Sequence, residues 1–354
     1  MTTRTASHQT RSMRTSHLAP LFAVAAARAG CRAQVIDDGS TGSTDTHTDS
    51  GTNGATGSGG PVRVAYTELI PKVLASDGTT LFWSSVGNPL ESTPVMGGGS
   101  VTILDPDSIG QGLLTFDDTN VYYIKDGRVA NMPKTGGTIA YNTDATVEQA
   151  TVLGSTLYWV ETPSSGDNVG LLESAPLQGG TPTVIVQFDD FLLSALGVNA
   201  TTAFLSLPEM LFAVPLTGDA PEGGTMIPDT PASNCYGFIS GTDTVYCMAQ
   251  AVPMAGVPLG GSIIAIASDG SATTLAPVSG ITLENGGIAI DDTFVYWVDN
   301  ANDGPLNDGS IMWVPKSGGT VTTVVKATLP VAVAVDANAV YWSDQLGNIW
   351  RLAK

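Results

Sequence analysis

The chain has 354 residues and a formal net charge of −19, with 13% charged residues, 42% hydrophobic residues, 41 Gly and 21 Pro. This composition excludes a long-helix or coiled-coil protein, which would be rich in Ala, Glu, Lys and Leu. Many Gly, Thr and Val residues are typical of short strands joined by tight turns, and the length suits one large all-β domain or two average domains.

The first thirty residues are predicted to be a signal peptide. Three arginines and no acidic residue precede an apolar run of ten residues, LAPLFAVAAA, at 18–27. Ten residues span about 15 Å as a helix, which is too short for a bilayer core of roughly 30 Å. The run therefore suits the hydrophobic region of a signal peptide better than a transmembrane helix.

The end of this segment is typical of bacterial lipoproteins. The residues AGC, ending at Cys31, resemble a lipobox, in which the cysteine is diacylated and becomes the new N-terminus, although Arg28 stands where the motif usually has a leucine-like residue. We predict that lipid on Cys31 anchors an exported protein in the cell envelope; ordinary secretion is the alternative. Arg32 rather than Asp follows the cysteine, which favours the outer membrane by enterobacterial sorting logic.

Residues 31–61 are predicted to form a disordered tether. Gly, Ser, Thr and Asp dominate positions 37–60, and such a segment cannot bury enough apolar surface to offset the entropy of ordering. Without residues 1–30 the chain carries 10 basic and 33 acidic residues, a net charge of −23. We therefore expect no nucleic-acid partner, and membrane contact only through the lipid.

A repeated aromatic phrase organises the rest of the chain. It occurs seven times, at spacings of 36 to 50 residues: LFWSS (81–85), VYYIK (121–125), LYWVE (157–161), AFLSL (203–207), VYCMA (245–249), VYWVD (295–299) and VYWSD (340–344). Each phrase follows a short apolar strand and a turn, and each precedes a loop and a third strand. Paired glycines then mark a tight turn into a fourth strand. Four short strands per repeat predict the blades of a β-propeller.

The aromatic pair in each phrase favours stacked blades. Neighbouring residues of a strand point to opposite faces of the sheet, so Tyr296 and Trp297 are both buried only if both faces are covered. We therefore predict an all-β, seven-bladed propeller of four-stranded antiparallel blades over 62–354, rather than a β-sandwich or a β-helix. The acidic turn DDT (291–293) is expected at an exposed corner between the first two strands.

Two families share these phrases. VYWVD and VYWSD resemble the YWTD repeat of low-density-lipoprotein-receptor-type propellers, and YWVD…GSIMWVPKSGG resembles the repeats of exported bacterial propeller proteins, including myxobacterial lipoproteins. The resemblance covers about 63–354 and implies the propeller fold. The receptor family has six blades where this chain has seven phrases, so that family's partners are not carried over.

The seventh repeat lacks a fourth strand, because NIWRLAK (348–354) matches only the third. The segment VRVAYTEL (62–69) is expected to supply it and so to remove the free edges of the ring. The pattern alternates, with two sets of residues on opposite faces: Val62, Val64 and Tyr66 on one, Arg63 and Ala65 on the other.

The composition of the predicted propeller limits its chemistry. All three histidines, at positions 8, 17 and 47, lie outside it, which excludes Ser–His–Asp and Cys–His nucleophilic sites and His-ligated zinc, copper or iron there. We predict no catalytic residue and no cofactor. A carboxylate pair could still act on a glycan, so a carboxylate-based glycan hydrolase or lyase is the alternative.

One polar run raises the question of calcium, which needs only oxygen ligands. The run is DNANDGPLNDGS at 299–310. It fails as an EF-hand loop, because Ala301 occupies a ligand position and Ser310 stands where a Glu is needed. We interpret it as a long polar loop, with bound calcium as the alternative.

Two cysteines lie in one predicted hairpin. The sequence CYGFISGTDTVYC places Cys235 and Cys247 near the base of a hairpin that turns around 241–243. Antiparallel neighbours bring Cβ atoms within disulfide range, and an exported protein meets oxidising conditions. We predict a disulfide within one blade; two separate buried thiols are the alternative.

The loops between second and third strands, called b–c loops, differ most among the repeats, and long loops often carry function. We predict that a monomer binds a protein or a glycan on the rim formed by the b–c loops and by the d–a loops that join successive blades. A purely structural envelope component is the alternative. The candidate ligand-binding residues are Glu161, Asp167, Asn168, Asp299, Asn302, Asp303, Asn307 and Asp308.

Overall fold

A computed structural model describes residues 59–84, 89–107, 114–143, 146–161, 169–189, 195–207, 210–217, 224–228, 232, 235–250, 260–279, 287–300 and 308–354. The predicted signal peptide, Cys31 and the tether up to residue 58 lie outside these residues. Within them, 28 strands form seven four-stranded antiparallel sheets. The same part of the chain contains no helix long and apolar enough to cross a membrane.

Each sheet is one blade, numbered in chain order, with strands a to d running from the centre of the ring outward. Blade 1 is β2 (Val73–Ser76), β3 (Thr80–Ser84), β4 (Leu90–Pro94) and β5 (Thr102–Asp105). Blade 2 is β6 (Leu114–Phe116), β7 (Asn120–Lys125), β8 (Arg128–Pro133) and β9 (Ala140–Tyr141). Blade 3 is β10 (Val147–Leu153), β11 (Thr156–Glu161), β12 (Val169–Pro176) and β13 (Thr183–Asp189). Blade 4 is β14 (Ala195–Val198), β15 (Thr202–Leu207), β16 (Met210–Pro215) and β17 (Thr225–Ile227).

The remaining blades follow the same plan. Blade 5 is β18 (Cys235–Ile239), β19 (Thr244–Gln250), β20 (Gly261–Ala267) and β21 (Ala272–Val278). Blade 6 is β22 (Ile288–Ile290), β23 (Phe294–Asp299), β24 (Asp308–Pro315) and β25 (Thr322–Thr328). Blade 7 is β26 (Pro330–Val335), β27 (Ala339–Asp344), β28 (Asn348–Ala353) and β1 (Val62–Tyr66).

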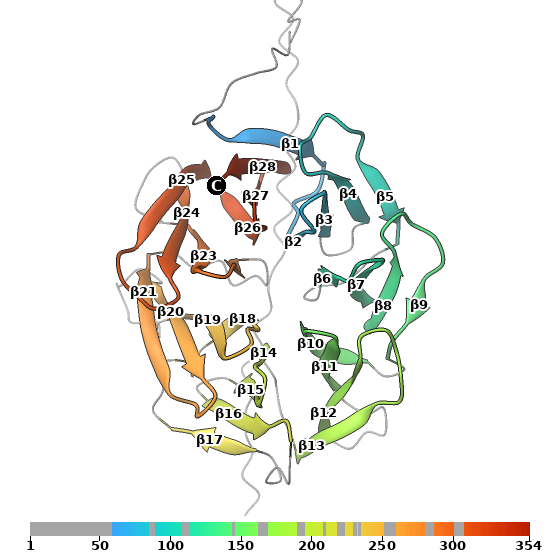
Figure 1. Ribbon diagram of the computed structural model, residues 1–354, viewed down its shortest axis with the longest axis vertical. Coiled ribbons are helices and arrows are strands. Elements are labelled where there is room, and N and C mark those ends of the chain that lie inside the picture. The colour runs from blue at the N-terminus through green and yellow to red at the C-terminus, as the bar shows by residue number, and fades with distance from the viewer. Residues whose placement is uncertain are drawn as a thin grey trace, which may run out of the picture. The chain divides into compact units, whose positions relative to one another are not determined.

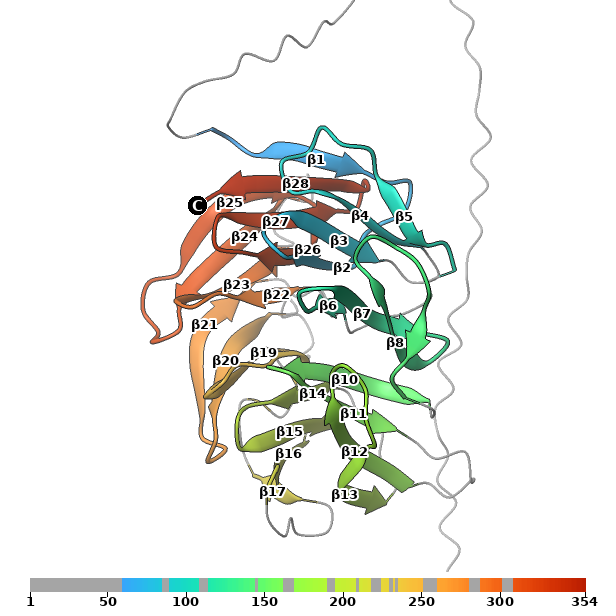
Figure 2. The same cartoon turned by 45° about the vertical axis from the view of Figure 1, so that its right-hand side comes forward.

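The seven blades stand around a ring with their a strands toward its centre (Figure 1), and the view turned by 45° shows the same stacking of sheets (Figure 2). Neighbouring a strands contact one another, as β2 does with β26 and β14 with β18. The predicted seven-bladed, all-β propeller is confirmed. Its seven aromatic phrases coincide with the seven b strands.

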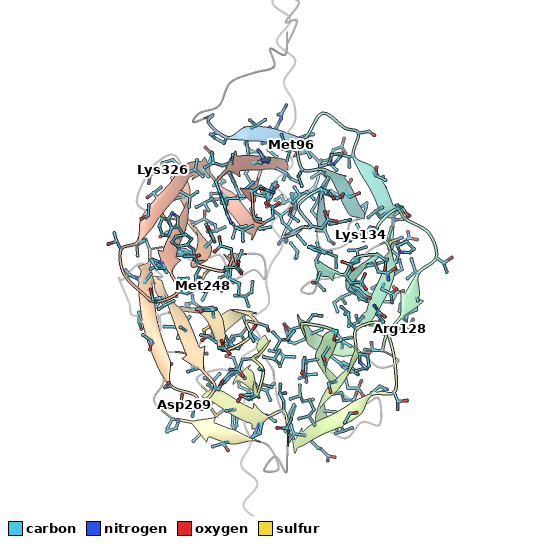
Figure 3. All side chains as sticks on the ribbon, viewed as in Figure 1. Met96, Arg128, Lys134, Met248, Asp269 and Lys326 are labelled. Atoms are coloured by element: carbon cyan, nitrogen blue, oxygen red, sulfur yellow. A yellow bond between two sulfur atoms is a disulfide. The ribbon has the colours of Figure 1, made fainter. Side chains whose placement is uncertain are left out.

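Both faces of a blade are buried between its neighbours, which is why adjacent aromatic residues fit in one strand. Tyr296 and Trp297 of β23 are 4% and 0% exposed. Trp297 packs with blade 5 residues such as Met248, and Tyr296 packs with blade 7 residues such as Trp342. Figure 3 shows side chains filling the space between successive sheets.

The ring is closed by the first strand of the chain, as predicted. β1 pairs antiparallel with β28, with Val62 opposite Arg351 and Tyr66 opposite Asn348. Figure 1 shows the two strands side by side, one blue and the other dark red. Blade 7 therefore has four strands like every other blade, and its outer strand comes from the opposite end of the sequence.

β1 departs from the expected alternation. Val64 and Ala65 are adjacent, yet both are buried, and the pairing with β28 shifts between Arg63 and Ala65. A bulge of this kind adds one residue to a strand, so that the residues on either side of it no longer alternate between faces. Tyr66, expected on the face of Val64, is instead exposed, and the strand ends there rather than at Leu69.

A disulfide joins Cys235 of β18 to Cys247 of β19, with 5.7 Å between the two Cα atoms. In the register of this hairpin, Cys235 lies opposite Ala249 and Cys247 opposite Phe238, so the cysteines are diagonal rather than direct neighbours. Both are buried in the core between blades 4 and 5, where Phe204 and Ile264 also pack.

Removing β1 should destabilise the ring, whereas removing the tether should not. Deleting residues 1–58 is expected to leave the melting midpoint unchanged. Deleting residues 1–70 takes away β1 and leaves β28 as an unpaired edge, so the midpoint should fall by at least roughly 5 °C or the protein should aggregate. Differential scanning calorimetry and light scattering of both truncations check this. If the two melt alike and stay monomeric, β1 does not close the ring.

Candidate functional site

The structure places two of the eight candidate residues. Glu161 is the last residue of β11, and Asp299 is the last residue of β23. Asp308 begins β24, but its side chain is not among the described parts of the structure. The other five candidates lie outside the described residues: Asp167, Asn168, Asn302, Asp303 and Asn307.

Asp299 is buried at the rim end of its blade, and its side chain accepts a backbone hydrogen bond. It is 8% exposed, and its Oδ2 accepts a hydrogen bond of 3.3 Å from the backbone N–H of Ser279, which follows the outer strand of blade 5. Asp344, at the same position in blade 7, is also buried and accepts hydrogen bonds of 2.9 Å from the Leu346 backbone N–H and the Trp350 indole. These aspartates hold loops and strands together.

The first aspartate of the acidic turn between strands a and b accepts hydrogen bonds from within the same hairpin. In blade 6, Oδ1 of Asp291 accepts the backbone N–H groups of Thr293 and Phe294 at 2.8 and 2.7 Å. Oδ2 accepts the hydroxyl of Tyr296 at 2.8 Å. Asp291 is half-buried, whereas Asp292 and Thr293 are exposed, so the expected exposed corner is correct for the last two residues of the turn.

This arrangement recurs around the ring. Asp117 in blade 2 and Asp336 in blade 7 accept two turn N–H groups and a tyrosine hydroxyl in the same way. In blades 1 and 4, Asp77 and Asn199 accept the two N–H groups, and phenylalanine replaces the tyrosine five residues later. The oxygens of these Asp and Asn side chains are therefore engaged in stabilising the hairpins.

Lysines from the following blade reach two of these turns. Nζ of Lys354 lies 2.7 Å from Oδ2 of Asp291, and Nζ of Lys134 lies 2.7 Å from Oδ2 of Asp77. Figure 3 labels Lys134 on the side of blade 2 that faces blade 1. Burial alone would raise the pKa of Asp77 and of Asp291, but hydrogen bonds from the lysine and the turn outweigh it and lower each pKa to about 2.

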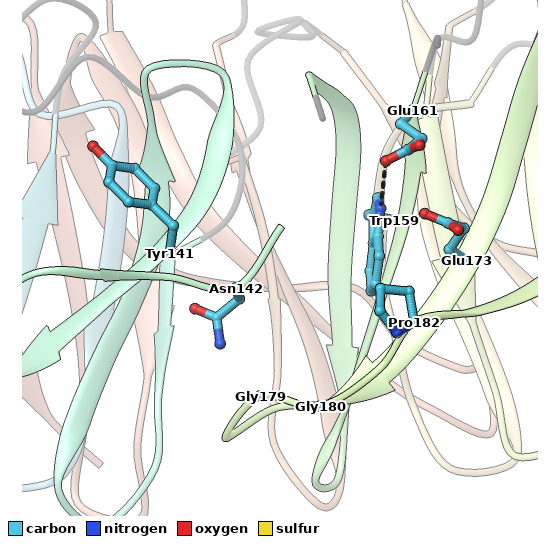
Figure 4. Close-up of a pocket in the computed structure, with 8 residues that line it drawn as sticks. All are labelled: Tyr141, Asn142, Trp159, Glu161, Glu173, Gly179, Gly180 and Pro182. Atoms are coloured by element: carbon cyan, nitrogen blue, oxygen red, sulfur yellow. Dashed lines mark hydrogen bonds between the residues drawn. The ribbon is translucent and has the colours of Figure 1, made fainter. Parts of the chain in front are cut away.

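Glu161 is part of a carboxylate pair that sequence reasoning did not find. Glu173 of β12 lies directly opposite Trp159 of β11, so that Trp159, Glu161 and Glu173 share one face of blade 3. The indole N–H of Trp159 donates to Oε2 of Glu161 at 3.2 Å. Figure 4 shows both carboxyl groups on the side of the indole N–H, and they lie within hydrogen-bonding reach of each other.

The pair lines a pocket of about 380 Å³ between blades 2 and 3. Its other walls are Tyr141, Asn142, Trp159, Gly179, Gly180 and Pro182 (Figure 4). The outer strand of blade 2, β9, has only two residues, whereas the corresponding β13 and β21 have seven each. The short strand leaves the outer part of the facing blade 3 uncovered, and the pocket occupies that space.

Electrostatics distinguish this pair from the other acidic residues of the ring. Burial raises the pKa of Glu173, and the adjacent charge and hydrogen bond of Glu161 raise it further, while the Trp159 N–H opposes the shift. Glu173 is 8% exposed. A buried carboxylate beside a second carboxylate holds a proton more tightly than usual, or gains from a cation placed beside it.

Blade 7 carries one of the described parts of the predicted rim, and large apolar side chains are exposed there beside Glu68 and Gln345. Four large side chains are exposed there: Tyr66 (57%), Leu69 (43%), Ile70 (37%) and Leu346 (60%). The backbone N–H of Thr67 donates to the carbonyl of Gly347 at 2.9 Å, which joins the d–a loop to the b–c turn. Gly347 has a φ of 82°, and any Cβ at this position would collide with the carbonyl oxygen of Thr67. We call this group the apolar corner.

Internal comparison of the repeats contains a signal for Glu173. In blade 1, Glu91 lies opposite Trp83, and the Trp83 indole donates to its Oε2 at 2.8 Å. Aligning the two blades by their tryptophans puts Glu173 in the position of Glu91. The alignment does not show the length of β9. This length determines that the carboxylates of blade 3 face an open pocket.

Comparisons with known proteins agree on the fold. No protein-family model and no curated protein sequence matches the chain. Among solved structures, PorZ, a surface component of the type-IX secretion system of Porphyromonas gingivalis, is similar with a TM-score of 0.55 and 10% identity over 83% of this chain and 39% of that one. YCF48 bound to D1 peptide gives 0.53 and 10% over 83% and 94%, and the WD40 propeller domain of Doa1 gives 0.53 and 8% over 82% and 96%. The fold is a β-propeller. At these identities the likeness extends no further than the fold.

Within the described ranges, no group of three or more His, Cys, Asp or Glu side chains is arranged to hold a metal ion. Most of the polar run considered for calcium, 301–307, lies outside those ranges. The site chemistry that the structure describes is therefore the carboxylate pair of blade 3 and the apolar corner of blade 7.

Substituting the turn aspartate of blade 6 should destabilise the fold. Asp291→Ala leaves two turn N–H groups and the Tyr296 hydroxyl without their acceptor, and it removes the carboxylate paired with Lys354, which keeps its hydrogen bond to the Asp336 carbonyl. The free energy of unfolding at pH 7 should fall by about 1–3 kcal/mol. The matched control Asp292→Ala removes an exposed carboxylate one residue away and should change it by less than about 0.5 kcal/mol. Urea denaturation of the full chain measures both, and equal effects would show that Asp291 does not hold the turn.

The same variant should reveal a pH dependence. The pKa of Asp291 is about 2 in the folded protein, and an unfolded aspartate titrates near 4. The stabilisation is therefore complete above about pH 4 and disappears as the pH falls toward 2. The difference in stability between the wild type and Asp291→Ala should shrink over this range, and a constant difference would contradict the assignment.

Proposed function

We propose that this protein is an envelope-anchored interaction module that holds a protein partner on the rim of b–c and d–a loops. The observation that carries the proposal is the apolar corner of blade 7. Four large apolar side chains are exposed on the described part of this rim, although such residues gain free energy when they are covered. Contiguous exposed apolar groups on a soluble domain mark sites of association.

The hydrogen bonds within the apolar corner support this assignment. The apolar corner is built from the bulged strand β1, the d–a loop after it and the b–c turn between β27 and β28, and hydrogen bonds hold these parts together. A surface fixed by the scaffold loses little conformational entropy when a partner binds. The similar structure of YCF48 holds a bound D1 peptide, so a propeller of this general form is suited to a polypeptide ligand.

Anchoring rests on the N-terminal sequence. A lipid on Cys31 and a flexible tether of about thirty residues would leave the ring free within roughly 30 Å of the membrane surface. This distance is compatible with a role in assembling or recruiting other envelope proteins. We also propose kinship with the exported bacterial propellers whose YWTD-like repeats the b strands resemble.

A glycan hydrolase is less well supported. Glycosidase carboxyl groups stand roughly 5 to 9.5 Å apart, with the glycosidic bond between them. Glu161 and Glu173 lie on the same side of the pocket (Figure 4), rather than on either side of a space for the glycosidic bond. The pair therefore does not favour this alternative.

Fatty-acid labelling tests the anchor. In the native host, a clickable fatty acid should label the wild-type protein and leave Cys31→Ala unlabelled, and the variant should leave the membrane fraction. Equal labelling of both proteins, or a soluble wild type with an intact N-terminus, would disprove the anchor without affecting the rim.

Cross-linking in the envelope tests the rim. Full-length protein should capture a defined protein partner, and Leu69→Ser with Leu346→Ser should weaken that capture by roughly tenfold or more, because buried apolar anchors dominate such interfaces. The matched control Met96→Ser removes an exposed apolar side chain on the opposite rim, in the c–d turn of blade 1, and should bind as the wild type does. Equal capture by both variants would refute a partner on this rim, and capture of glycan alone would refute a protein partner.

A further inference from the structure

The pocket between blades 2 and 3 is lined by two carboxylates and by no basic residue. It contains two carboxylates, and the one N–H donor shown to them is the indole of Trp159. None of its eight lining residues is basic. The ion pairs found in the described part of the chain do not include Glu161 or Glu173. Buried charges are stable in proteins when they are paired, so this pair is incomplete.

Other buried carboxylates of the ring have full sets of partners. Asp105, at the interface of blades 1 and 2, pairs with Lys125 at 2.8 Å and accepts the Tyr123 hydroxyl at 2.7 Å. Glu91, the half-buried counterpart of Glu173 in blade 1, accepts the indole N–H of Trp83. In blade 3 the same indole position serves two carboxylates.

The shape of the pocket fits a cation with an alkyl stem. A volume of about 380 Å³ is near the lower end of ligand pockets and suits a group the size of a long side chain. The rings of Trp159 and Pro182 lie beside the carboxylates, whereas most of the exposed lining is polar. The ring of Tyr141 lies across the pocket (Figure 4), and the Arg128 guanidinium stacks on it at 3.8 Å from the ring centre. Asn142 is already engaged, since its Nδ2 donates to the Leu177 carbonyl at 3.0 Å and its Oδ1 accepts from Asn131. It therefore helps to hold the wall and leaves recognition to the two glutamates.

We propose that this pocket binds an organic cation, an ammonium or guanidinium group on an alkyl stem, with Glu161 and Glu173 as its counter-ions and the rings of Trp159 and Pro182 beside its stem. The source is either a lysine or arginine side chain of a polypeptide or a free diamine, which share this chemistry. The site lies on the flank of the ring, between two blades, and is independent of the apolar corner.

Calorimetric titration of the full chain tests the site. The probes are N-acetyl-lysine amide, N-acetyl-arginine amide and the free diamine cadaverine, with N-acetyl-norleucine amide as a neutral probe of the same stem. We expect saturable binding of at least one cation and none of the norleucine derivative. Binding of the acetylated amino acids alone indicates a polypeptide source, and tighter binding of cadaverine indicates a free amine.

Variants separate the pocket from general acidity. Glu173→Gln and Glu161→Gln should each weaken cation binding by roughly tenfold or more. Glu91→Gln, the matched change opposite the tryptophan of blade 1, should leave binding unchanged. If Glu173→Gln melts well below the wild type, Glu161→Gln decides the question. Absence of saturable cation binding, equal binding of the norleucine derivative, or loss of binding in Glu91→Gln would each overturn the proposal.

Discussion

A blade that stands between two others has no face open to water, so its b strand carries apolar residues in an unbroken run instead of alternating with polar ones. Tyr296 and Trp297 show the consequence, because one packs on blade 7 and the other on blade 5. The same demand makes an unfilled blade costly, and the first strand of the chain completes blade 7 by pairing with β28. Stacking and closure together account for the ring, and they leave variation to the rims and the outer strands.

The features repeated in every blade could be predicted from the sequence, whereas the bulge of blade 7 and the pocket beside blade 3 could not. The phrase that includes Tyr296 recurs often enough to predict the b strands, the blade number and the role of 62–69. The bulge in β1 lies where β1 pairs with β28, the seam between the two ends of the described chain. No other blade contains such a pairing, so the repeats carry no signal for it. The burial of the Asp291 side chain was not predicted either. The sequence DDT suggests an exposed turn, and only the structure shows the hydrogen bonds from the turn and from Tyr296.

The acidic character of the chain divides into structural and available carboxylates. Turn residues such as Asp117 and Asp336 accept hydrogen bonds from backbone N–H groups and tyrosine hydroxyls, and Asp105 forms an ion pair with a lysine. Among the described residues, no lysine or arginine forms an ion pair with Glu161 or Glu173. Their exposure to a pocket depends on the two-residue length of β9 in the neighbouring blade, which is a property of packing between blades and not of either strand's sequence. A ligand site can thus arise where a repeat is cut short.

Native-state hydrogen exchange measures the central claim, that closure makes the ring one cooperative unit. An open array of repeats frays from its ends, whereas a closed ring has none. The amides of β27 and β3, on either side of the seam, should therefore exchange with the same free energy as those of β11 and β23, within the error of the measurement. Exchange from β27 and β3 at a clearly lower free energy than from β11 would show that the seam opens separately and that β1 does not close the ring.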